Sequence, residues 1–408
     1  MKRVLIYRSE LLPASETFIA SQAAALTRYS PVFAGLRRDS QGLPLDTFRV
    51  HSLTTENRLR DKLLRRSYMR IGFAPGFHRE LRNLQPSLIH AHFAVDACIA
   101  LTLRQQLGVP LIVTLHGYDV MRNDQAHGKT KEGRTYLARR GALLREADLF
   151  LCVSDHIRRH ALERGFPDEK LIVLHIGIEL PRTSCAAACE KTGHADPSVV
   201  LFVGRMVEKK GCIHLLRAME CVQRNLPAAP LVLLGDGPLR AELEHDARER
   251  MRNVSFLGIR PPCEVRGWMQ RARLLAAPSI VAGDGDAEGL PTVLCEAQAM
   301  GLPIVAFSGC GVDEAVVADE TALLVRQKDD EALADAILRL ITDEALHQRL
   351  STAGRERAAK LFDIRRQTAL LEEYYDEVIL QAGDSASQET AVSTRKRSKT
   401  SFDIRRPR

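Results

Sequence analysis

Short apolar runs alternate with segments of helical spacing along most of the chain. Residues 4–7 form the first apolar run, residues 16–26 follow it with helical spacing, and residues 88–93 and 111–115 are further runs. Apolar runs of this length predict buried strands, and their alternation with helices predicts parallel α/β units. The sequence therefore predicts an α/β chain of doubly wound sheets.

The pattern occurs in two halves that are separated by a segment without periodicity. Residues 181–197 are rich in Ala, Cys, Ser and Thr, which is typical of a linker. A chain of 408 residues is also too long for one ordinary core. We therefore expect an N-terminal domain at 1–180, a C-terminal domain at 198–360, a terminal helix at 361–382 that is placed to cross back to the first domain, and a basic disordered tail at 383–408.

The net charge of +7 is a mild basic excess, and part of it is concentrated in one stretch. Basic residues and apolar residues are interleaved at 58–82. Such a stretch fits contact with an anionic membrane, for example near a lipid-diphosphate acceptor, and it fits a solvated basic face equally well. Nucleic acid is not expected, because aromatic side chains are not interleaved with the basic ones as base stacking requires. The basic residues are Arg58, Arg60, Lys62, Arg65, Arg66, Arg70, Arg79 and Arg82.

Cysteine usage and hydropathy bear on the location of the protein. Nine scattered cysteines favour a reduced, cytoplasmic chain. No apolar run approaches the about 18–20 residues that span a bilayer, so contact with the inner face of the plasma membrane would be peripheral. Cys185, Cys189 and His194 lack a fourth ligand for zinc. Asp284-Gly-Asp286 spells a metal motif, but we favour a polar hinge loop there and expect no metal.

The most informative stretch runs from Glu288 to Pro303 and contains two carboxylates eight positions apart. Pro291 suits a first helical turn, and Gly301 is typical of a helix end, so a short helix is predicted at Thr292–Met300. Its free N–H groups would cradle an anion beside Glu288. Glu296, one turn further along, could accept hydrogen bonds from a vicinal diol such as a ribose. A nucleotide sugar is a ligand of this kind, because it has an anionic diphosphate with hydroxyl groups on both sides.

Three further segments carry candidate chemistry. Gly204-Arg205 and Lys210-Gly211 follow an apolar strand and place cations in a loop before a helix, which favours a phosphate site. Gly235-Asp236-Gly237 follows the next strand, although the final glycine of a dinucleotide fingerprint is missing. His116 follows the strand at 111–115, and the carboxyl ends of such strands line ligand crevices.

These motifs resemble those of a known family. The pair Glu288 and Glu296, with Gly-Leu-Pro after the first glutamate and Glu-Ala-x-Ala-x-Gly-x-Pro at the second, resembles the signature of retaining nucleotide-sugar glycosyltransferases of family 4. Ser15-Glu16-Thr17-Phe18-Ile19 is similar to a segment of bacterial exopolysaccharide glycosyltransferases of the colanic-acid type. The resemblance implies the GT-B fold, in which two doubly wound domains face each other across a cleft.

The resemblance also implies roles for individual residues. Arg205 and Lys210 would hold the donor diphosphate, Glu288 would position the sugar, and His116 would reach that sugar from the other domain. The donor would be a UDP- or GDP-sugar, the acceptor a glycan or a lipid-diphosphate-linked glycan in surface polysaccharide biosynthesis, and neither a metal nor another cofactor would be required. The expected donor-binding residues are Gly204, Gly235, Asp236, Gly237, Gly289, Leu290, Pro291, Thr292 and Glu296, and those on the acceptor side are Ser15, Glu16 and His92, the last of which also fits a packing role.

Three alternatives remain open at the level of the sequence. A nucleotide-sugar epimerase can have the same two-domain fold. A non-catalytic subunit could bind the nucleotide sugar without transferring it. A nicotinamide oxidoreductase fits least well, because it needs the complete glycine fingerprint and an acidic partner for the ribose.

Overall fold

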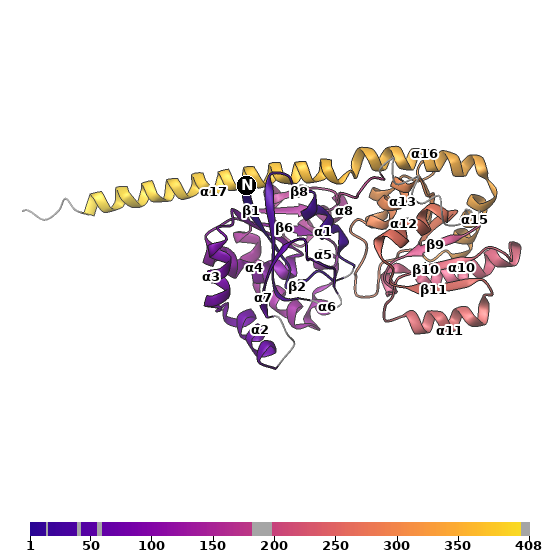
Figure 1. Ribbon diagram of the computed structural model, residues 1–408, viewed down its shortest axis with the longest axis horizontal. Coiled ribbons are helices and arrows are strands. Elements are labelled where there is room, and N and C mark those ends of the chain that lie inside the picture. Colours follow the sequence, from indigo (N-terminus) through magenta and orange to yellow (C-terminus); the bar gives the residue numbers. More distant parts are fainter. Residues whose placement is uncertain (14, 39–41, 55–58, 182–197, 401–408) are drawn as a thin grey trace, which may run out of the picture.

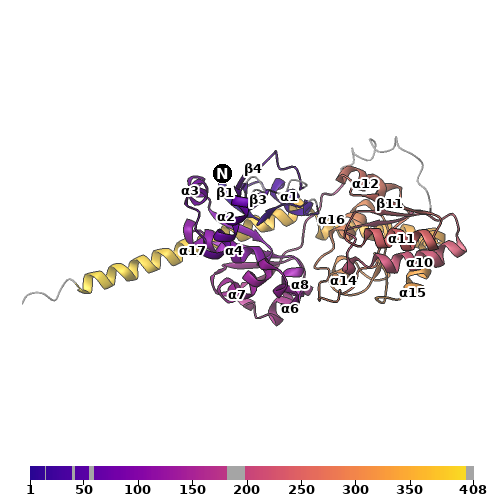
Figure 2. The same cartoon turned by 90° about the horizontal axis from the view of Figure 1, so that it is seen from below.

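Two parallel sheets lie side by side along the long axis of the molecule, and a long C-terminal helix crosses the first of them (Figure 1). The computed structural model describes residues 1–13, 15–38, 42–54, 59–181 and 198–400, with side chains as far as Asp384. Most of the predicted linker, including Cys185, Cys189 and His194, lies outside these ranges. The same side-by-side arrangement is seen from below in Figure 2.

The first half is built on a sheet with the order β2-β3-β1-β5-β6-β7-β8, in which β4 pairs with β3. All of its pairings are parallel. The central strands are buried on both faces, as expected for apolar runs without alternation. The strands are β1 (Lys2–Tyr7), β2 (Glu10–Leu11), β3 (Tyr29–Arg38), β4 (Arg49–Thr54), β5 (Leu88–His92), β6 (Leu111–Leu115), β7 (Leu149–Cys152) and β8 (Leu171–Val173).

Helices cover this sheet, and some of them begin at a side-chain cap. Ser154 caps α8 by accepting a hydrogen bond from the Ile157 N–H, and Thr130 caps α7 in the same way. Ser15 is a residue type typical of N-caps, but it does not cap α1, which begins one residue later, with Glu16 at the cap position and no side-chain cap bond. The helices are α1 (Thr17–Ala24), α2 (Leu59–Ile71), α3 (Pro75–Asn83), α4 (Ala94–Leu107), α5 (Tyr118–Met121), α6 (Asp124–Gly128), α7 (Lys131–Glu146), α8 (Asp155–Glu163) and the 3-10 turn η1 (Asp168–Lys170).

The second half repeats the plan with a parallel sheet of order β11-β10-β9-β12-β13-β14. The predicted class of two doubly wound sheets is thereby confirmed. The strands are β9 (Val200–Val203), β10 (Leu231–Leu234), β11 (Val254–Gly258), β12 (Leu274–Ala277), β13 (Ile304–Phe307) and β14 (Ala322–Val325). The helices are η2 (Glu208–Lys210), α10 (Cys212–Asn225), α11 (Arg240–Arg250), α12 (Pro262–Arg271), α13 (Thr292–Met300), α14 (Val312–Ala315), α15 (Asp330–Thr342) and α16 (Glu344–Leu361).

The last helix, α17 (Ile364–Thr400), returns to the first half. The Tyr375 hydroxyl lies 2.6 Å from Nδ1 of His90, and the Glu372 carboxylate accepts the backbone N–H groups of Thr27 and Arg28. The sequence predicted a disordered tail from residue 383, whereas the helical backbone continues to Thr400. Extending an existing helix needs no new nucleation, and no proline interrupts the segment.

The two halves pack directly against each other. One apolar cluster contains Ile157 of α8 together with Leu290 and Leu294 of the second half. The Glu314 carboxylate accepts the Asp155 N–H at the start of α8 at 2.9 Å and lies 2.8 Å from Nε2 of His175. These contacts bring the turns that follow β6 and precede α13 to a common edge.

Candidate functional site

The turn after β6 and the loop before α13 meet at the junction of the halves. A Cβ atom built on Gly289 would lie 2.0 Å from the carbonyl oxygen of His116, so no larger residue fits without moving one half. Gly117, the residue after His116, lies close to the carbonyl oxygen of Ala287. The Ser154 hydroxyl donates to the Gly289 carbonyl oxygen at 2.7 Å and fixes the same loop from α8. The fold thus places the His116 and Glu288 loops in contact.

Glu288 is buried and paired with a lysine from the loop after β9. Nζ of Lys210 lies 2.8 Å from Oε1 of Glu288, and the Ser279 hydroxyl donates to the same oxygen at 3.4 Å. Burial opposes ionisation of Glu288, but the charges of Lys210 and Lys209 outweigh it and hold the pKa of the carboxyl below its usual range. Glu288 is therefore a carboxylate at neutral pH, with an ammonium group fixed beside it.

The helix that follows Glu288 presents unpaired backbone donors. Pro291 occupies the cap position of α13, and within the described residues the N–H groups of Thr292 and Val293 have no hydrogen-bond acceptor. Leu290 and Pro291 are buried and anchor the turn. The positive end of this helix therefore lies immediately after the Glu288 and Lys210 pair, where an anion would be stabilised.

The first loops of the second half contain the other residues that the sequence predicted to contact a phosphate. Arg205 is exposed after Gly204, and its guanidinium has no ion pair with any residue that the structure describes. Gly235 has a φ of 130°, and a Cβ there would lie 1.9 Å from the Gly204 carbonyl oxygen, so the two glycine turns are pressed together. Arg205 is thus held on a rigid turn with its charge free for a ligand.

The Gly235–Gly237 turn is braced by its own aspartate. The Asp236 carboxylate accepts the Gly237 N–H at 2.7 Å and the Arg240 guanidinium at 2.8 Å. These bonds hold the pKa of Asp236 below its usual range. In this arrangement Asp236 shapes the turn, and its backbone faces Met206, whose N–H donates to the Asp236 carbonyl oxygen.

Glu296 differs from Glu288 in its electrostatic surroundings. It lies one turn into α13 and is only partly exposed, and burial raises its pKa to about 7, against the opposing charge of Arg266 on α12. Within the described chain its carboxyl has no hydrogen-bond or ion-pair partner. A carboxyl group of this kind can accept hydroxyl donors from a ligand.

His116 sits in an aromatic enclosure on the first half. Its ring stacks on His92 at a centroid distance of 5.3 Å, with Nε2 of His116 3.0 Å from Nδ1 of His92, and the rings of Phe18 and Phe93 close the other sides at 4.9 and 4.5 Å. Burial lowers the pKa of both histidines well below its usual range, so the pair is neutral. Nδ1 of His116 is buried without a hydrogen-bond partner in the described residues.

The structure adds a charged cluster that the sequence analysis missed. The Arg8 guanidinium donates to the Glu16 carboxylate at 2.9 Å and also binds Asp96, and all three side chains are buried. Arg8 lies 4.4 Å from the centre of the Phe93 ring. Glu16 is therefore turned inward toward the His116 enclosure, whereas Ser15 is exposed. A charged residue directly after a buried first strand was the available signal for Arg8.

Asp119 is a second residue that was missed. Its carboxylate accepts the Gly117 N–H at 2.8 Å and the Ala94 N–H at 3.0 Å. These bonds tie the turn after β6 to the start of α4. Asp119 thus fixes the backbone from which His116 projects, and its place in the run His-Gly-Tyr-Asp was the signal.

The aspartates of the candidate metal motif are each paired with a cation. Asp284 lies 2.8 Å from Nε of Arg122 in the first half, and Asp286 lies 3.1 Å from Nζ of Lys209. Among the described residues no group of three or more His, Cys, Asp or Glu side chains could hold a metal ion. The ion pair of Asp284 with Arg122 joins the two halves. Lys209 is paired with Asp286, whereas the neighbouring Lys210 is paired with Glu288.

Two family models match the chain, one in each half. The model described as Glycosyltransferase Family 4 matches residues 27–182, and the model described as Glycosyl transferases group 1 matches residues 188–357. The matched ranges contain the turn after β6 and the loops around Glu288.

Individual proteins give the same result. The chain is 32% identical to WcaL of Escherichia coli, a glycosyltransferase assigned to colanic acid biosynthesis, over 62% of each chain. It is 30% identical to WcaL of Salmonella typhimurium over 69% of each. The alignment with the first of these spans less than two thirds of that relative's length. The crystal structure of Anabaena HepE in complex with UDP-glucose matches 92% of this chain and all of HepE, with a TM-score of 0.72 and 19% identity.

The chain therefore belongs to family 4 of the glycosyltransferases. Its two facing sheets are those of the GT-B fold. Enzymes of this family use nucleotide-sugar donors, retain the anomeric configuration and generally need no metal. The family and the fold predicted from the sequence are both confirmed.

Proposed function

We propose that this chain transfers a sugar from a UDP-sugar to a hydroxyl of a glycan or lipid-diphosphate-linked acceptor, with retention at the anomeric carbon, in bacterial surface polysaccharide biosynthesis. The observation that carries the proposal is the Lys210 and Glu288 pair at the start of α13. The choice of UDP over GDP is supported by the UDP-glucose complex of HepE. The acceptor class is supported by the assignment of WcaL to colanic acid biosynthesis.

The donor diphosphate would bind among fixed positive charges. Lys210 carries three N–H donors, so it can keep its bond to Glu288 and also contact a phosphate oxygen. Arg205 can add a second cation, and the unpaired N–H groups of Thr292 and Val293 can donate to the remaining phosphate oxygens. Together they would stabilise the charge that develops on the departing diphosphate, which is where such groups contribute most to the rate.

The sugar would lie between the two halves. Glu288 would bind its hydroxyls from one side and His116 from the other, and Glu296 would accept the ribose hydroxyls. The bond from the anomeric carbon to the diphosphate oxygen breaks as the acceptor oxygen bonds on the same face. The acceptor proton passes to the departing phosphate oxygen, so no separate general base is needed. Positioning of the two reactants carries most of the rate.

A product assay tests this function. The purified chain is incubated with UDP-sugars, with and without an extract of lipid-linked glycans, and UDP release and the anomeric configuration of the product are measured. The proposal predicts acceptor-dependent UDP release and a product with the anomeric configuration of the donor. A new UDP-sugar isomer formed without acceptor would indicate an epimerase, and UDP binding without any product would indicate a non-catalytic subunit.

A further inference from the structure

Helix α2 has an outer face that no other part of the described chain covers. Five of the ten large apolar side chains that are strongly exposed in the described residues lie on this helix or just after it. Leu59, Leu63, Ile71 and Phe73 are 74, 55, 66 and 65% exposed. Scattered exposed apolar residues are ordinary, but such a concentration on one helix indicates a contact surface. The fifth is Leu64.

The inner face of α2 is firmly attached, so the outer face has a fixed orientation. Tyr68 is buried and packs edge-on against Phe77 of α3, with its hydroxyl 3.2 Å from Nε2 of His78. The Arg65 guanidinium donates to the hydroxyl of Thr54 at the end of β4. These contacts hold the helix on the body of the protein and turn the opposite side chains outward.

Cations and apolar groups lie beside one another on the outer face. Leu59, Leu63, Arg66 and Arg70 follow the spacing i, i+4, i+7 and i+11, so they form one stripe along the helix. A second stripe beside it has the same spacing and consists of Arg60, Leu64, Ser67 and Ile71. The helix has one acidic residue, Asp61, which is partly buried and lies 3.8 Å from Nε of Arg60. The outer face is therefore both apolar and positively charged.

We infer that the outer face of α2, together with Phe73, docks on a lipid bilayer with anionic headgroups. Leu59, Leu63, Ile71 and Phe73 would enter the boundary of the acyl chains, and the guanidinium groups of Arg66 and Arg70 would remain at the phosphates. The charge complementarity selects this partner. A second copy of the chain would bring like charges together, which disfavours association. Phe73 is the single aromatic side chain of this surface, whereas nucleic-acid binding uses aromatic side chains on which successive bases stack.

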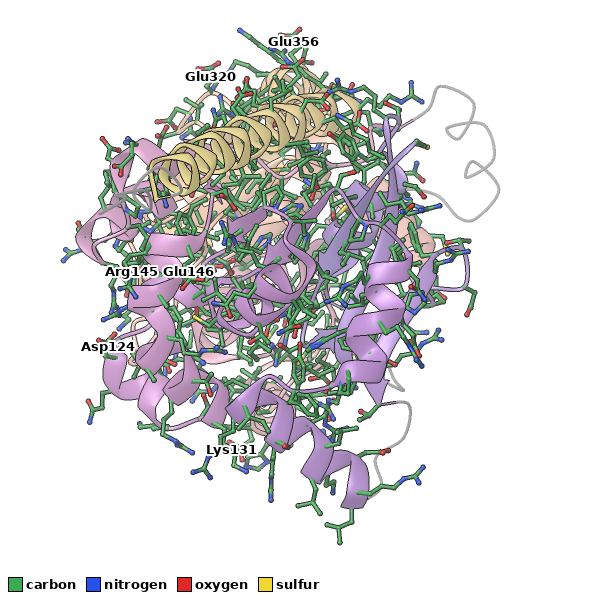
Figure 3. All side chains as sticks on the ribbon, turned by 90° about the vertical axis from the view of Figure 1, so that its left-hand side faces the viewer. Asp124, Lys131, Arg145, Glu146, Glu320 and Glu356 are labelled. Carbon is green, nitrogen blue, oxygen red and sulfur yellow. The ribbon has the colours of Figure 1, made fainter. Side chains whose placement is uncertain are left out.

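The position of α2 leaves it free for such contact. The helix lies at the edge of the first half that is opposite α17, away from the second half (Figure 1), and the end-on view in Figure 3 places it at the lower margin of the molecule. Docking through α2 therefore leaves the junction between the halves uncovered. No helix in the described ranges contains an apolar stretch sufficient to cross a bilayer, so the contact is a surface contact.

Vesicle sedimentation of the full chain tests the inference. Wild type is mixed with vesicles of equimolar phosphatidylglycerol and phosphatidylcholine, or of phosphatidylcholine alone. We expect binding to the anionic vesicles only, and weaker binding as salt increases. R66Q/R70Q is expected to bind about tenfold or more weakly, since each cation near the surface contributes about fivefold. L63Q/F73Q is expected to bind more weakly at every salt concentration.

Matched variants on the second half serve as controls. Arg248 and Arg252 are exposed basic residues, so R248Q/R252Q makes the same double change of charge elsewhere, and I259Q replaces one exposed apolar side chain there, since Ile259 is 67% exposed. The inference is overturned if both α2 variants bind as well as the controls, or if phosphatidylcholine alone binds equally. It is also overturned if wild type forms a dimer that L63Q/F73Q abolishes while vesicle binding is unchanged. UDP affinity, measured on the same samples, shows whether the donor site is intact independently of docking.

Discussion

Nζ of Lys210 lies 2.8 Å from Oε1 of Glu288, so an ion pair joins the loop after β9 to the loop before α13. This pair places a cation and a carboxylate within one hydrogen bond of each other at the edge where the two halves meet. The charges of Lys210 and Lys209 favour the ionised form of Glu288. The proposed donor site depends on this relationship, because Lys210 would hold the diphosphate while Glu288 holds the sugar.

Replacing Glu288 by Gln removes the negative charge but keeps the shape of the side chain. We expect turnover to fall by about 100-fold or more, as for the loss of one preorganised electrostatic group. A transferase assay with saturating donor measures this effect. Turnover within about threefold of wild type would contradict the assigned role.

The same variant reports on the depressed pKa of Glu288. A carboxyl whose pKa is lower in the folded state stabilises the fold above its ordinary pKa, and the stabilisation is lost as the pH falls through the folded value. We therefore expect wild type to be more stable than E288Q near neutral pH and the difference to shrink in acid, below about pH 4.5. Urea unfolding across this range measures it. A difference that is constant with pH would rule out the charge pairing with Lys210.

The contribution of Glu296 to stability is expected to depend on pH in the opposite direction to that of Glu288. Its pKa is raised from 4.5 to about 7 in the folded chain, so on raising the pH the carboxyl of the unfolded chain deprotonates before that of the folded chain. The stability of the fold therefore falls as the pH rises from about 4.5 to 7. E296Q should therefore be more stable than wild type above pH 7 and similar to it in mild acid. Thermal unfolding of both chains measures the difference.

Glu296 is also expected to couple pH to ligand binding. If its carboxylate accepts the ribose hydroxyls, UDP affinity should rise relative to that of E296Q as the pH passes through about 7. Comparing the two chains with the same ligand cancels the titration of UDP itself. A ratio of affinities that does not change with pH would exclude the ribose contact.

His92 is predicted to position His116 through the bond between their ring nitrogens. H92F keeps an aromatic ring but cannot make this bond, and we expect kcat to fall by about tenfold with UDP affinity unchanged, which corresponds to one hydrogen bond. H92N can restore the bond from a similar position and should recover most of the rate. Equal losses of UDP affinity and kcat in both variants would point to a purely structural role.

Gly289 is predicted to be essential for the contact between the halves. G289A would place a methyl group 2.0 Å from the carbonyl oxygen of His116, so the loop must move away from the first half. We expect lower stability and a large loss of kcat. G76A is the matched control, because nothing lies within 4 Å of a Cβ at Gly76 in α3. Retention of full activity in G289A would show that the two loops do not need this contact.

Local signals in the sequence were sufficient for the elements but not for their partners. Pro291 and Gly301 marked the ends of α13 correctly because capping depends on neighbouring residues. The salt bridge from Arg8 to Glu16 and Asp96, and the bond from Ser154 to Gly289, depend on how distant strands and helices are brought together. Spacing along the chain contains no information on such contacts.

The cap of α1 shows how tertiary contacts can override a local rule. Serine is a residue type that often caps helices, so Ser15 would suit the N-cap of α1. Glu16 takes that position instead, because its carboxylate is bound by Arg8 inside the first half. Lys210 and Lys209 are neighbours in the sequence but have separate partners, Glu288 and Asp286, and spacing alone does not assign these partners.

Titration calorimetry with UDP tests the central claim most directly. In the presence of a chelator, wild type and R252A are expected to bind UDP with equal affinity, because Arg252 precedes β11 at the opposite end of the sheet from the proposed donor site. R205A is expected to bind about tenfold or more weakly, since it loses a charge-assisted contact to the diphosphate. Undetectable binding to wild type, binding only in the presence of a divalent metal, or equal affinities in R205A and R252A would contradict the account.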